Sequence, residues 1–511
     1  MSSLWQATGP TIGFDEAAPR RPDVLVVGAG ITGLATAALL ARRGATVVVL
    51  EAREVGAVAT GNTTAKLSLL QGDRLHRILA LAAPEAAQAF VDGSLEGQRR
   101  LLELLEERGE AAQLLPAVSY ASGRAGAESL ERELEAARSL GLPVETGGAE
   151  SLPFPVAGAI RLEQQAQLQP MTVLSVLAQE LRERGGRIMR GAVRSVRAAR
   201  DGVTVVTDAG SWRAGTAVLA TGAPVPARAT ATLLEAHRSY AAAYRVDAPL
   251  PRAMALSVDA PSRSLRTAEV DGETLLIAGG VGHSVGRHPD PRRLVAELDG
   301  WVQQHWPGAE RTHVWSAQDY RTPDRLPWVG ARAGSGGRVL LATGFDKWGM
   351  TGGVMSALAL TGRIAGREPE WARTLRRRGT TPTAVGRLSG AFVATVGADL
   401  RGWREALAPA AAPPEGEGRL GRDGVRLVGT STVDGQTRQV SAFCPHVGAL
   451  VRWNPQERSW DCSAHGSRFA PDGTRLEGPA ACALELRAGA IAGPRRDASA
   501  GARPGPRPPQ G

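Results

Sequence analysis

The 511-residue sequence is poor in lysine and cysteine. Lysine and arginine together number 60, yet Lys66 and Lys347 are the only lysines, so arginine supplies nearly every positive side-chain charge. There are three cysteines, Cys444, Cys462 and Cys482. An odd number cannot form an even disulfide framework, and their crowding near the carboxyl end favours a metal site.

Long apolar runs are also missing. Runs such as VLVV and VMSALALTG are too short, or too interrupted by glycine and polar residues, to span a bilayer, so we expect no membrane span. Residues 1–20 lack the basic flank, apolar core and small-residue cleavage site of a secretory signal. A cytoplasmic protein is therefore expected.

The charge balance is basic but spread along the chain. The formal net charge is +9 and the isoelectric point is about 10.3, a balance that could attract nucleic acid through its phosphates. Acidic residues are nearly as numerous, 51 against 60, and the dense run Arg376 to Arg378 is typical of a solvated helix end. We expect no nucleic-acid partner.

The length and the 43% hydrophobic content allow two or three packed domains. Near residue 408 the Pro- and Ala-rich stretch APAAAPPEGEG indicates a joint, and the short strands broken by DG turns beyond it indicate a small all-β module. The predicted divisions are an amino-terminal arm (1–21), a large domain (22–372), a helix and linker (373–417), the all-β module (418–488) and a disordered tail (489–511).

Hydrophobic periodicity gives the order of elements in the large domain. Residues 22–51 are predicted as strand, turn, helix and strand, and residues 75–141 as mainly helical. Another helix should begin at Pro170. Residues 238–315 alternate strands with one helix, and residues 339–366 form a last strand and helix. The pattern predicts an α/β domain.

Gly28, Gly30 and Gly33 form a G-x-G-x-x-G motif between an apolar strand and a helix, and Glu51 ends the next strand. Gly28 permits a tight turn, Gly30 lets the backbone approach a pyrophosphate, and Gly33 lets the helix pack on the strand. The helix amino terminus can bind phosphate, and Glu51 can accept hydrogen bonds from ribose hydroxyls. The motif predicts a dinucleotide site, which FAD or NAD could fill.

Two further strands end in A-T-G, VLATGA at residues 218–223 and VLLATGFDKWGMTGG at residues 339–353. Strand tips of this form, with Thr221 and Gly222 in the first and Gly344 in the second, are expected beside a bound dinucleotide. The second strand continues into a helix whose amino terminus would stabilise negative charge on a reduced flavin ring. FAD is therefore favoured over NAD.

Two short motifs near the carboxyl end each supply one cysteine and one histidine. CPH contains Cys444 and His446, and CSAH contains Cys462 and His465. Zinc fingers pair cysteine with cysteine and histidine with histidine within a motif. The mixed motifs here let one iron take both thiolates and the other both imidazoles, which is the Rieske 2Fe-2S arrangement. Cys482 lies outside both motifs and is expected to be a small buried residue.

The segments SLWQAT, TGNTTAKLS, LPFPVAGAIRLEQQAQLQP, WSAQDYRTPDRLPWVG and ATGFDKWGMT resemble the D-amino acid oxidase (DAO) superfamily of FAD-dependent oxidoreductases. Within it, the sequence is similar to the subgroup with a carboxy-terminal Rieske domain. The resemblance covers nearly the whole chain except the tail. It implies a Rossmann-like FAD-binding domain interleaved with an antiparallel substrate domain, formed by residues of about 85–165 and 230–315.

The resemblance also implies which residues contact FAD, because it places residues 60–66 beside the flavin. The expected FAD-binding residues are Gly28, Gly30, Ile31, Thr32, Gly33, Glu51, Thr60, Thr63, Thr64, Val193, Thr221, Gly222, Gly344, Trp348, Gly349, Met350 and Thr351.

Both lysines lie in segments that the resemblance places against the flavin ring. A planar guanidinium does not replace a compact ammonium at such a place. Lys66 and Lys347 are therefore candidate catalytic residues that stabilise anionic reduced flavin or position a water at its reactive edge. The alternative is that the two lysines occur in these segments by chance. Further candidates on strands of the implied substrate domain are Tyr240, Arg266 and His283, any of which could bind a carboxylate or serve packing alone.

The expected function is oxidation of a small amine or amino acid by hydride transfer to FAD, with electrons leaving through a Rieske cluster to an unknown acceptor. Two alternatives stay open. The cluster could instead feed the flavin, or the protein could be an electron-transfer module that serves a protein partner without a small substrate.

Overall fold

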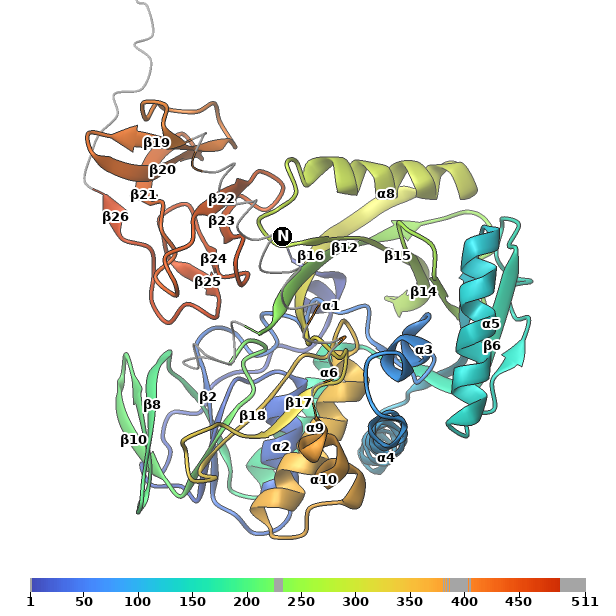
Figure 1. The fold of residues 1–511 in the computed structure, drawn as a ribbon, viewed down its shortest axis with the longest axis horizontal. Helices are drawn as coiled ribbons and strands as arrows, with labels where there is room; N and C mark the ends of the chain where they lie inside the picture. The colour runs from blue at the N-terminus through green and yellow to red at the C-terminus, as the bar shows by residue number, and fades with distance from the viewer. Residues whose placement is uncertain are drawn as a thin grey trace, which may run out of the picture.

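The computed structural model describes residues 2–224, 233–379 and 406–487, with the single positions 381, 383, 386 and 403. Figure 1 shows an α/β part at the bottom, a second sheet with its helices above it, and a small β part at the upper left. The predicted tail, residues 489–511, lies outside the described residues, as does most of the stretch between residues 380 and 405.

A six-stranded sheet forms the base of the molecule in the order β17-β18-β11-β1-β2-β7. Strands β18, β11, β1, β2 and β7 are parallel, and β17 runs antiparallel to β18. The strands are β1 (Val24–Val27), β2 (Val47–Glu51), β7 (Arg187–Arg190), β11 (Thr216–Leu219), β17 (Trp328–Ala331) and β18 (Val339–Thr343).

The two faces of this sheet are covered differently because side chains alternate along each strand. Val24 and Val26 pack into the core formed with helices α2, α6 and α9, whereas Leu25 and Val27 pack against a three-stranded sheet. The helices are α2 (Ile31–Ala41), α6 (Pro170–Glu183) and α9 (Gly349–Ile364), and the small sheet contains β8 (Val193–Ala199), β9 (Gly202–Thr207) and β10 (Gly210–Ala214). The helix expected from Pro170 is confirmed as α6.

A second, nine-stranded sheet is interleaved with the first along the chain and runs in the order β16-β12-β15-β14-β13-β4-β6-β3, with β5 beside β6. We call it the upper sheet. Its strands are β3 (Lys66–Leu67), β4 (Gln113–Ala121), β5 (Glu145–Thr146), β6 (Gly158–Gln167), β12 (Glu235–Arg245), β13 (Met254–Ser257), β14 (Arg263–Val270), β15 (Glu273–Ser284) and β16 (Glu310–Arg321).

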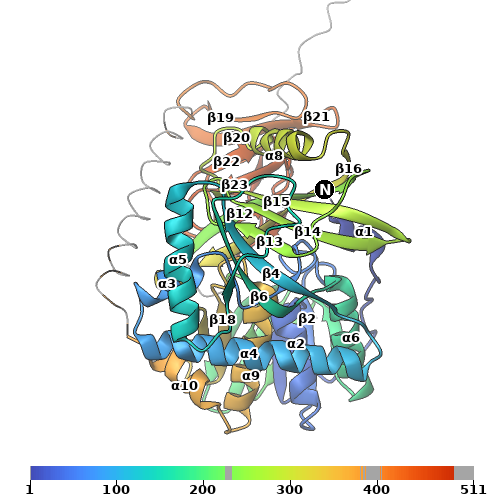
Figure 2. The ribbon, with the colours of Figure 1, turned by 90° about the vertical axis from the view of Figure 1, so that its right-hand side faces the viewer.

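Further helices pack either on the upper sheet or beside the six-stranded sheet and its helices, as Figures 1 and 2 show. α4 packs against α9, where Gly97 lies close to the backbone of Met355, and α8 packs on β15. These helices are α3 (Arg74–Leu79), α4 (Pro84–Glu107), α5 (Arg124–Ser139), α8 (Arg292–His305) and α10 (Glu370–Arg377). No described helix combines the length and apolarity needed to cross a membrane.

The amino-terminal arm is fixed to the rest of the molecule. Ser3 caps helix α1 (Leu4–Thr8), and its hydroxyl also donates to the carbonyl of Gly61. The indole of Trp5 donates to the Thr63 carbonyl at 2.6 Å and meets the ring of Trp315 edge-on. The arm therefore holds the loop that follows β2.

The carboxy-terminal part consists of two four-stranded antiparallel sheets around one small core. We call it the β module. The first sheet contains β19 (Gly418–Asp423), β20 (Arg426–Val433), β21 (Gln436–Ser441) and β26 (Leu486–Arg487), and the second contains β22 (Val451–Asn454), β23 (Ser459–Cys462), β24 (Arg468–Phe469) and β25 (Arg475–Glu477).

The segment that precedes β19 is bound to the β module. The Ala410 amide donates to the Arg422 carbonyl at 2.9 Å, and the Gly416 amide donates to the Thr432 carbonyl at 2.8 Å. The Glu415 carboxylate accepts hydrogen bonds from the turn between β20 and β21. Residues 409–417, expected as part of a linker, therefore lie along the module.

Candidate functional site

A cavity of about 580 Å³ lies where the carboxyl edge of the six-stranded sheet meets the upper sheet and the β module. The loops after β1 and β2 form one side of it, and strands β12 and β16 form another. The segment around β25 closes a third side. Three parts of the chain that are distant in sequence thus share one cavity.

The glycine motif forms the tight turn expected of it. Gly28 has a φ of +104°, and a Cβ on it would lie 2.5 Å from the Ala220 carbonyl oxygen. A Cβ on Gly33 would lie 1.9 Å from the Gly28 carbonyl oxygen, so this glycine lets helix α2 approach β1. Gly30 is the N-cap residue of α2 and has no side chain to fill the space in front of the helix. The turn leaves room for a pyrophosphate at the helix start.

Glu51 and Thr60 stand beside this turn. The Glu51 carboxylate accepts hydrogen bonds from the amides of Ala29 and Arg53, both at 2.9 Å, and also lines the cavity. The Thr60 hydroxyl accepts a hydrogen bond from the Ile31 amide at 3.1 Å. The carboxylate retains lone pairs for a ribose hydroxyl, since each of its oxygens can accept more than one hydrogen bond.

Most of the residues expected to bind the cofactor line this cavity. They are Gly28, Gly30, Ile31, Thr32, Glu51, Thr60, Thr63, Thr64, Val193, Thr221, Gly222, Trp348, Gly349 and Met350.

Three expected cofactor residues are not part of the lining. Gly33 lies behind the turn, where it permits the helix packing described above. Gly344, with a φ of +80°, packs against the side chain of Thr322. The Thr351 hydroxyl donates to the Ser68 carbonyl at 3.1 Å and accepts a hydrogen bond from the Ser68 amide. Each has a structural task at the edge of the site.

Lys66 lies at the end of the cavity next to the upper sheet. Its ammonium donates to the Ala255 carbonyl at 2.7 Å and to the Ser264 hydroxyl at 2.8 Å. Burial, with the nearby Arg266 guanidinium, lowers the pKa of Lys66 well below its usual value. The side chain is held in place at the cavity wall.

Lys347 enters the cavity from a strained loop. Asp346 and Lys347 have φ values of +51° and +74°, a backbone region that non-glycine residues adopt rarely and often at functional sites. The Asp346 carboxylate is held by Arg321 at 2.8 Å and Arg325 at 3.0 Å. A Cβ on Gly282 would lie 2.7 Å from the Lys347 ammonium, so the glycine makes room for it. The ammonium is accessible from the cavity, yet the surrounding protein lowers its pKa by desolvation.

The other three catalytic candidates differ in their position relative to the cavity. The Tyr240 ring contributes to the lining, but its hydroxyl donates to Glu457 of the β module at 3.3 Å. The Arg266 guanidinium lies outside the lining and donates to the carbonyls of Thr64 and Leu168, which fixes the loop before β3. His283 stacks on Tyr240 outside the lining, and burial lowers its pKa to about 3, so it is a neutral packing partner.

His237 and Asp319 also line the cavity, although sequence analysis did not single them out. The register of β12 and β16 places them directly opposite each other. The Asp319 carboxylate accepts hydrogen bonds from the amides of Lys347 at 2.6 Å and Tyr320 at 2.7 Å. Burial raises the pKa of Asp319 to about 6. Asp319 is in the quoted stretch WSAQDYR, but only strand pairing reveals its neighbours.

The cysteine and histidine motifs form two similar loops. In the first, the Cys444 amide donates to the Ala449 carbonyl at 2.8 Å, and in the second the Cys462 amide donates to the Ser467 carbonyl at 2.8 Å. Each loop contains a glycine with positive φ four residues after its cysteine, Gly448 or Gly466 in the two loops. The two loops therefore have the same backbone turn, with the cysteine and the histidine of each motif near its start.

The two loops bring like side chains together. A hydrogen bond joins the thiols of Cys444 and Cys462 and lowers the pKa of the Cys444 thiol. The rings of His446 and His465 lie 5.1 Å apart at 89°, and the buried Nδ1 of His465 has no protein partner. Among the described residues, no three His, Cys, Asp or Glu side chains are grouped as ligands of one metal ion. A thiol pair beside an imidazole pair fits a cluster of two irons, each with two protein ligands.

Cys482 lies apart from these loops and is exposed, so the expectation of a buried residue is wrong. Ala480 and Leu484 on either side are buried in the module core, whereas Cys482 and Ala483 between them are exposed.

Comparison with known families matches residues 23–363 to the DAO family, described as FAD dependent oxidoreductase. A relative from Bacillus subtilis (strain 168), YhfW, is 28% identical over 490 residues, which is 90% of this chain and 92% of the relative. Its name describes a Rieske 2Fe-2S iron-sulfur protein.

Solved structures of two proteins have a similar fold. L-proline dehydrogenase from P. horikoshii has a TM-score of 0.58 at 19% identity and covers 69% of this chain and 96% of its own. Glycine oxidase from Geobacillus kaustophilus has a TM-score of 0.57 at 21% identity and covers 68% of this chain and 96% of its own.

We expect Gly30→Val to lower the flavin content of the purified protein at least about tenfold, because the side chain would occupy the space in front of the helix. Absorbance of bound flavin per chain measures this effect. Gly123→Val is the matched control, since Gly123 is also an extended N-cap glycine but faces open space. Full flavin content in Gly30→Val would show that the glycine motif does not bind the pyrophosphate of FAD.

We expect Asp319 to make stability depend on pH in an unusual direction. Its folded pKa of about 6 lies above its ordinary value of 3.8, so the folded protein binds this proton more tightly than the unfolded chain. Its contribution to the free energy of unfolding therefore falls, by at most about 3 kcal/mol, as the pH rises from about 4 to about 6.

Asp319→Asn tests this pH dependence. The melting temperature of the variant relative to wild type should rise over that pH range, as followed by calorimetry. A difference that stays constant with pH would contradict the raised pKa.

Proposed function

This chain belongs to the DAO family of FAD-dependent oxidoreductases, and on that premise we propose that it oxidises a small amine or amino-acid-like substrate by hydride transfer to FAD. We further propose that the electrons leave through a Rieske 2Fe-2S cluster in the β module. The supporting observation is that one cavity, which contains the glycine turn, is bounded by the module that contains the two Cys-His loops.

The residues around the cavity fit FAD. The turn at Gly28 and Gly30 and the start of α2 would hold the pyrophosphate, and Glu51 would accept hydrogen bonds from the ribose. At the opposite end, α9 begins at Gly349 with its amino terminus toward the cavity, where it favours negative charge. When bound, FAD would supply hydride acceptance and the cluster would supply one-electron transfer.

Lys347 is the proposed charged group at the reacting end. Its backbone amide is fixed by Asp319, and its ammonium has the room that Gly282 leaves. An ammonium held in this way can stabilise negative charge or orient a water without reorganising during the reaction.

The remaining cavity wall suits a small polar substrate. Lys66 is near Ser264 on the side of the upper sheet, and His237 and Ser239 are on the same strand, β12. The Lys347 ammonium, which is accessible from the cavity, favours a ligand that carries a carboxylate, such as an amino acid. The fold shared with L-proline dehydrogenase and glycine oxidase is consistent with this substrate class.

In the β module, Cys444 and Cys462 would hold one iron and His446 and His465 the other. The backbone amides of residues after each cysteine point at the sulfurs, and the Ser467 hydroxyl reaches Cys444. Such hydrogen bonds stabilise thiolates and tune the redox potential of a cluster. The resemblance of YhfW over most of both chains supports this assignment.

Anaerobic mixing of the flavin-loaded protein with a panel of amines and amino acids tests the function. At least one compound should bleach the flavin absorbance. If none does, while a one-electron donor reduces the flavin, the protein transfers electrons without a small substrate and the proposal is wrong.

Lys347→Met should keep its flavin, because the phosphates are held elsewhere, but should slow flavin reduction by about ten- to a hundredfold. Stopped-flow absorbance with a bleaching substrate measures the rate. Lys347→Arg is the control for charge, and it should also be slow because the planar guanidinium does not fit beside Gly282. Equal rates of flavin reduction in wild type and Lys347→Met would contradict the proposed role of this lysine.

Cys462→Ser removes one proposed iron ligand. Substrate should still reduce the flavin without air, but turnover with a one-electron acceptor should fall at least about tenfold because the onward path is lost. Cys482→Ser, which changes the exposed cysteine of the same module, should leave turnover unchanged. Undiminished turnover in Cys462→Ser would mean that the module does not carry the electrons.

A further inference from the structure

One segment of the β module forms part of the cavity wall. Residues 474–478, which include strand β25, line the cavity together with Ala483. They face the side that contains Glu51, Arg53 and Arg194, where the nucleotide half of the dinucleotide is expected. The module is therefore a wall of the same site as the glycine motif.

Direct hydrogen bonds join this segment and the residues just after it to other parts of the chain. The Arg53 guanidinium donates to the Leu476 carbonyl at 2.8 Å, and the Arg194 guanidinium donates to the Ala481 carbonyl at 2.9 Å. The Tyr320 hydroxyl donates to the Gly478 carbonyl at 3.1 Å. These bonds reach the module from the loop after β2, from β8 and from β16 of the upper sheet.

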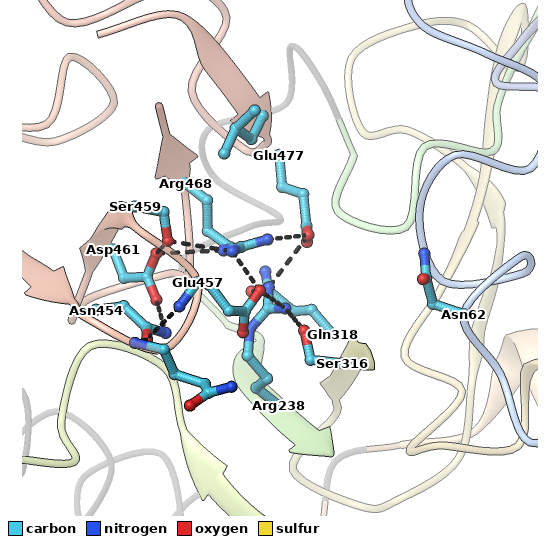
Figure 3. A network of polar contacts seen from close by, with 12 residues as sticks. Asn62, Arg238, Ser316, Gln318, Asn454, Glu457, Ser459, Asp461, Arg468 and Glu477 are labelled. Atoms are coloured by element: carbon cyan, nitrogen blue, oxygen red, sulfur yellow. Dashed lines mark hydrogen bonds and ion pairs between the residues drawn. The ribbon is translucent and has the colours of Figure 1, made fainter. Parts of the chain in front are cut away.

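A buried ion cluster also holds the module in place, as Figure 3 shows. Arg238 of β12 is only 1% exposed and lies 3.1 Å from both Glu457 and Glu477 of the module. Arg468 pairs with the same two carboxylates, and the Gln318 amide donates to the Gly466 carbonyl at 2.8 Å. Breaking one partner of such a buried cluster leaves uncompensated charge, so Arg238 strongly favours docking.

The docked surfaces are in close contact at the proposed cluster loops. A Cβ on Gly466 would lie 2.4 Å from the Ala236 side chain, and a Cβ on Gly286 would lie 2.8 Å from the Ser463 amide nitrogen. The module has little freedom to shift while these contacts persist.

We propose that residues 474–478 of the β module are a binding element of the FAD site, which closes the cavity beside Glu51. The inference rests on the proposed function. Arg475 is the foremost residue of this element, since it lines the cavity, and its guanidinium is held by the Ala480 carbonyl at 3.0 Å. Its side chain lies within electrostatic reach of Glu51 and Arg194, and burial lowers its pKa.

The consequence is a coupling between cofactor binding and docking. A ligand that contacts both parts must favour their association by the same factor by which association favours the ligand. FAD should therefore leave slowly while the module is docked and quickly when docking is weakened.

Hydrogen exchange of the full chain, with and without FAD, tests the inference directly. FAD should slow exchange of peptides from the start of α2 and, in addition, of peptides that contain residues 474–478. If the helix start is protected but residues 474–478 are not, the inference is overturned and the FAD site stands. If neither is protected, the proposed FAD site fails and the inference with it.

The rate of flavin release provides a second test that does not depend on activity. Arg238→Gln weakens docking although Arg238 is absent from the cavity lining, and it should speed release at least tenfold. Glu133→Gln is the matched control, because Glu133 is a buried charge on α5, and Figure 1 shows α5 on the opposite side of the molecule from the module. It should not change the release rate.

Arg475→Ala covers the case in which Arg238→Gln does not fold. It should also speed flavin release at least tenfold, whereas Arg426→Ala, an exposed arginine of the same module, should not. Release at the wild-type rate from folded Arg475→Ala and Arg238→Gln would overturn the inference.

Discussion

The buried charges of Arg238, Arg468, Glu457 and Glu477 require the β module and the upper sheet to stay together. Each arginine contacts both carboxylates, and Arg238 is the member of the four that belongs to the upper sheet. If Arg238 were lost, the docked module would bury both carboxylates with Arg468 as their shared arginine partner, which leaves charge uncompensated. The position of the Cys-His loops and the closed side of the cavity both depend on this cluster.

Strands β12 and β16 serve both sites because side chains alternate along them. On one face, His237 and Asp319 are opposite each other at the cavity. On the other face, Arg238 and Gln318 are opposite each other and bind the module. One strand pair thus contributes side chains both to the cavity and to the contact with the β module.

Much of the fold could be predicted from the sequence. The G-x-G-x-x-G motif, the helix from Pro170 and the last strand and helix are local patterns, and they appear as predicted. The family named from short segments is confirmed by the match over residues 23–363. For the site, the sequence led to both lysines and to most of the lining, but Arg266 and His283 lie outside it, since a strand residue alone does not reveal which face it occupies.

By itself, the sequence determined the features that depend on local spacing: the glycine turn, the two Cys-His motifs and the rarity of lysine. Spacing fixes these because a turn or a ligand pair needs only a few consecutive residues. Tertiary structure alone decided that Asp319 supports Lys347, that Tyr240 reaches Glu457, and that residues 474–478 form a wall of the cavity. These contacts join residues up to hundreds of positions apart, and strand register and domain docking, which no local pattern encodes, bring them together.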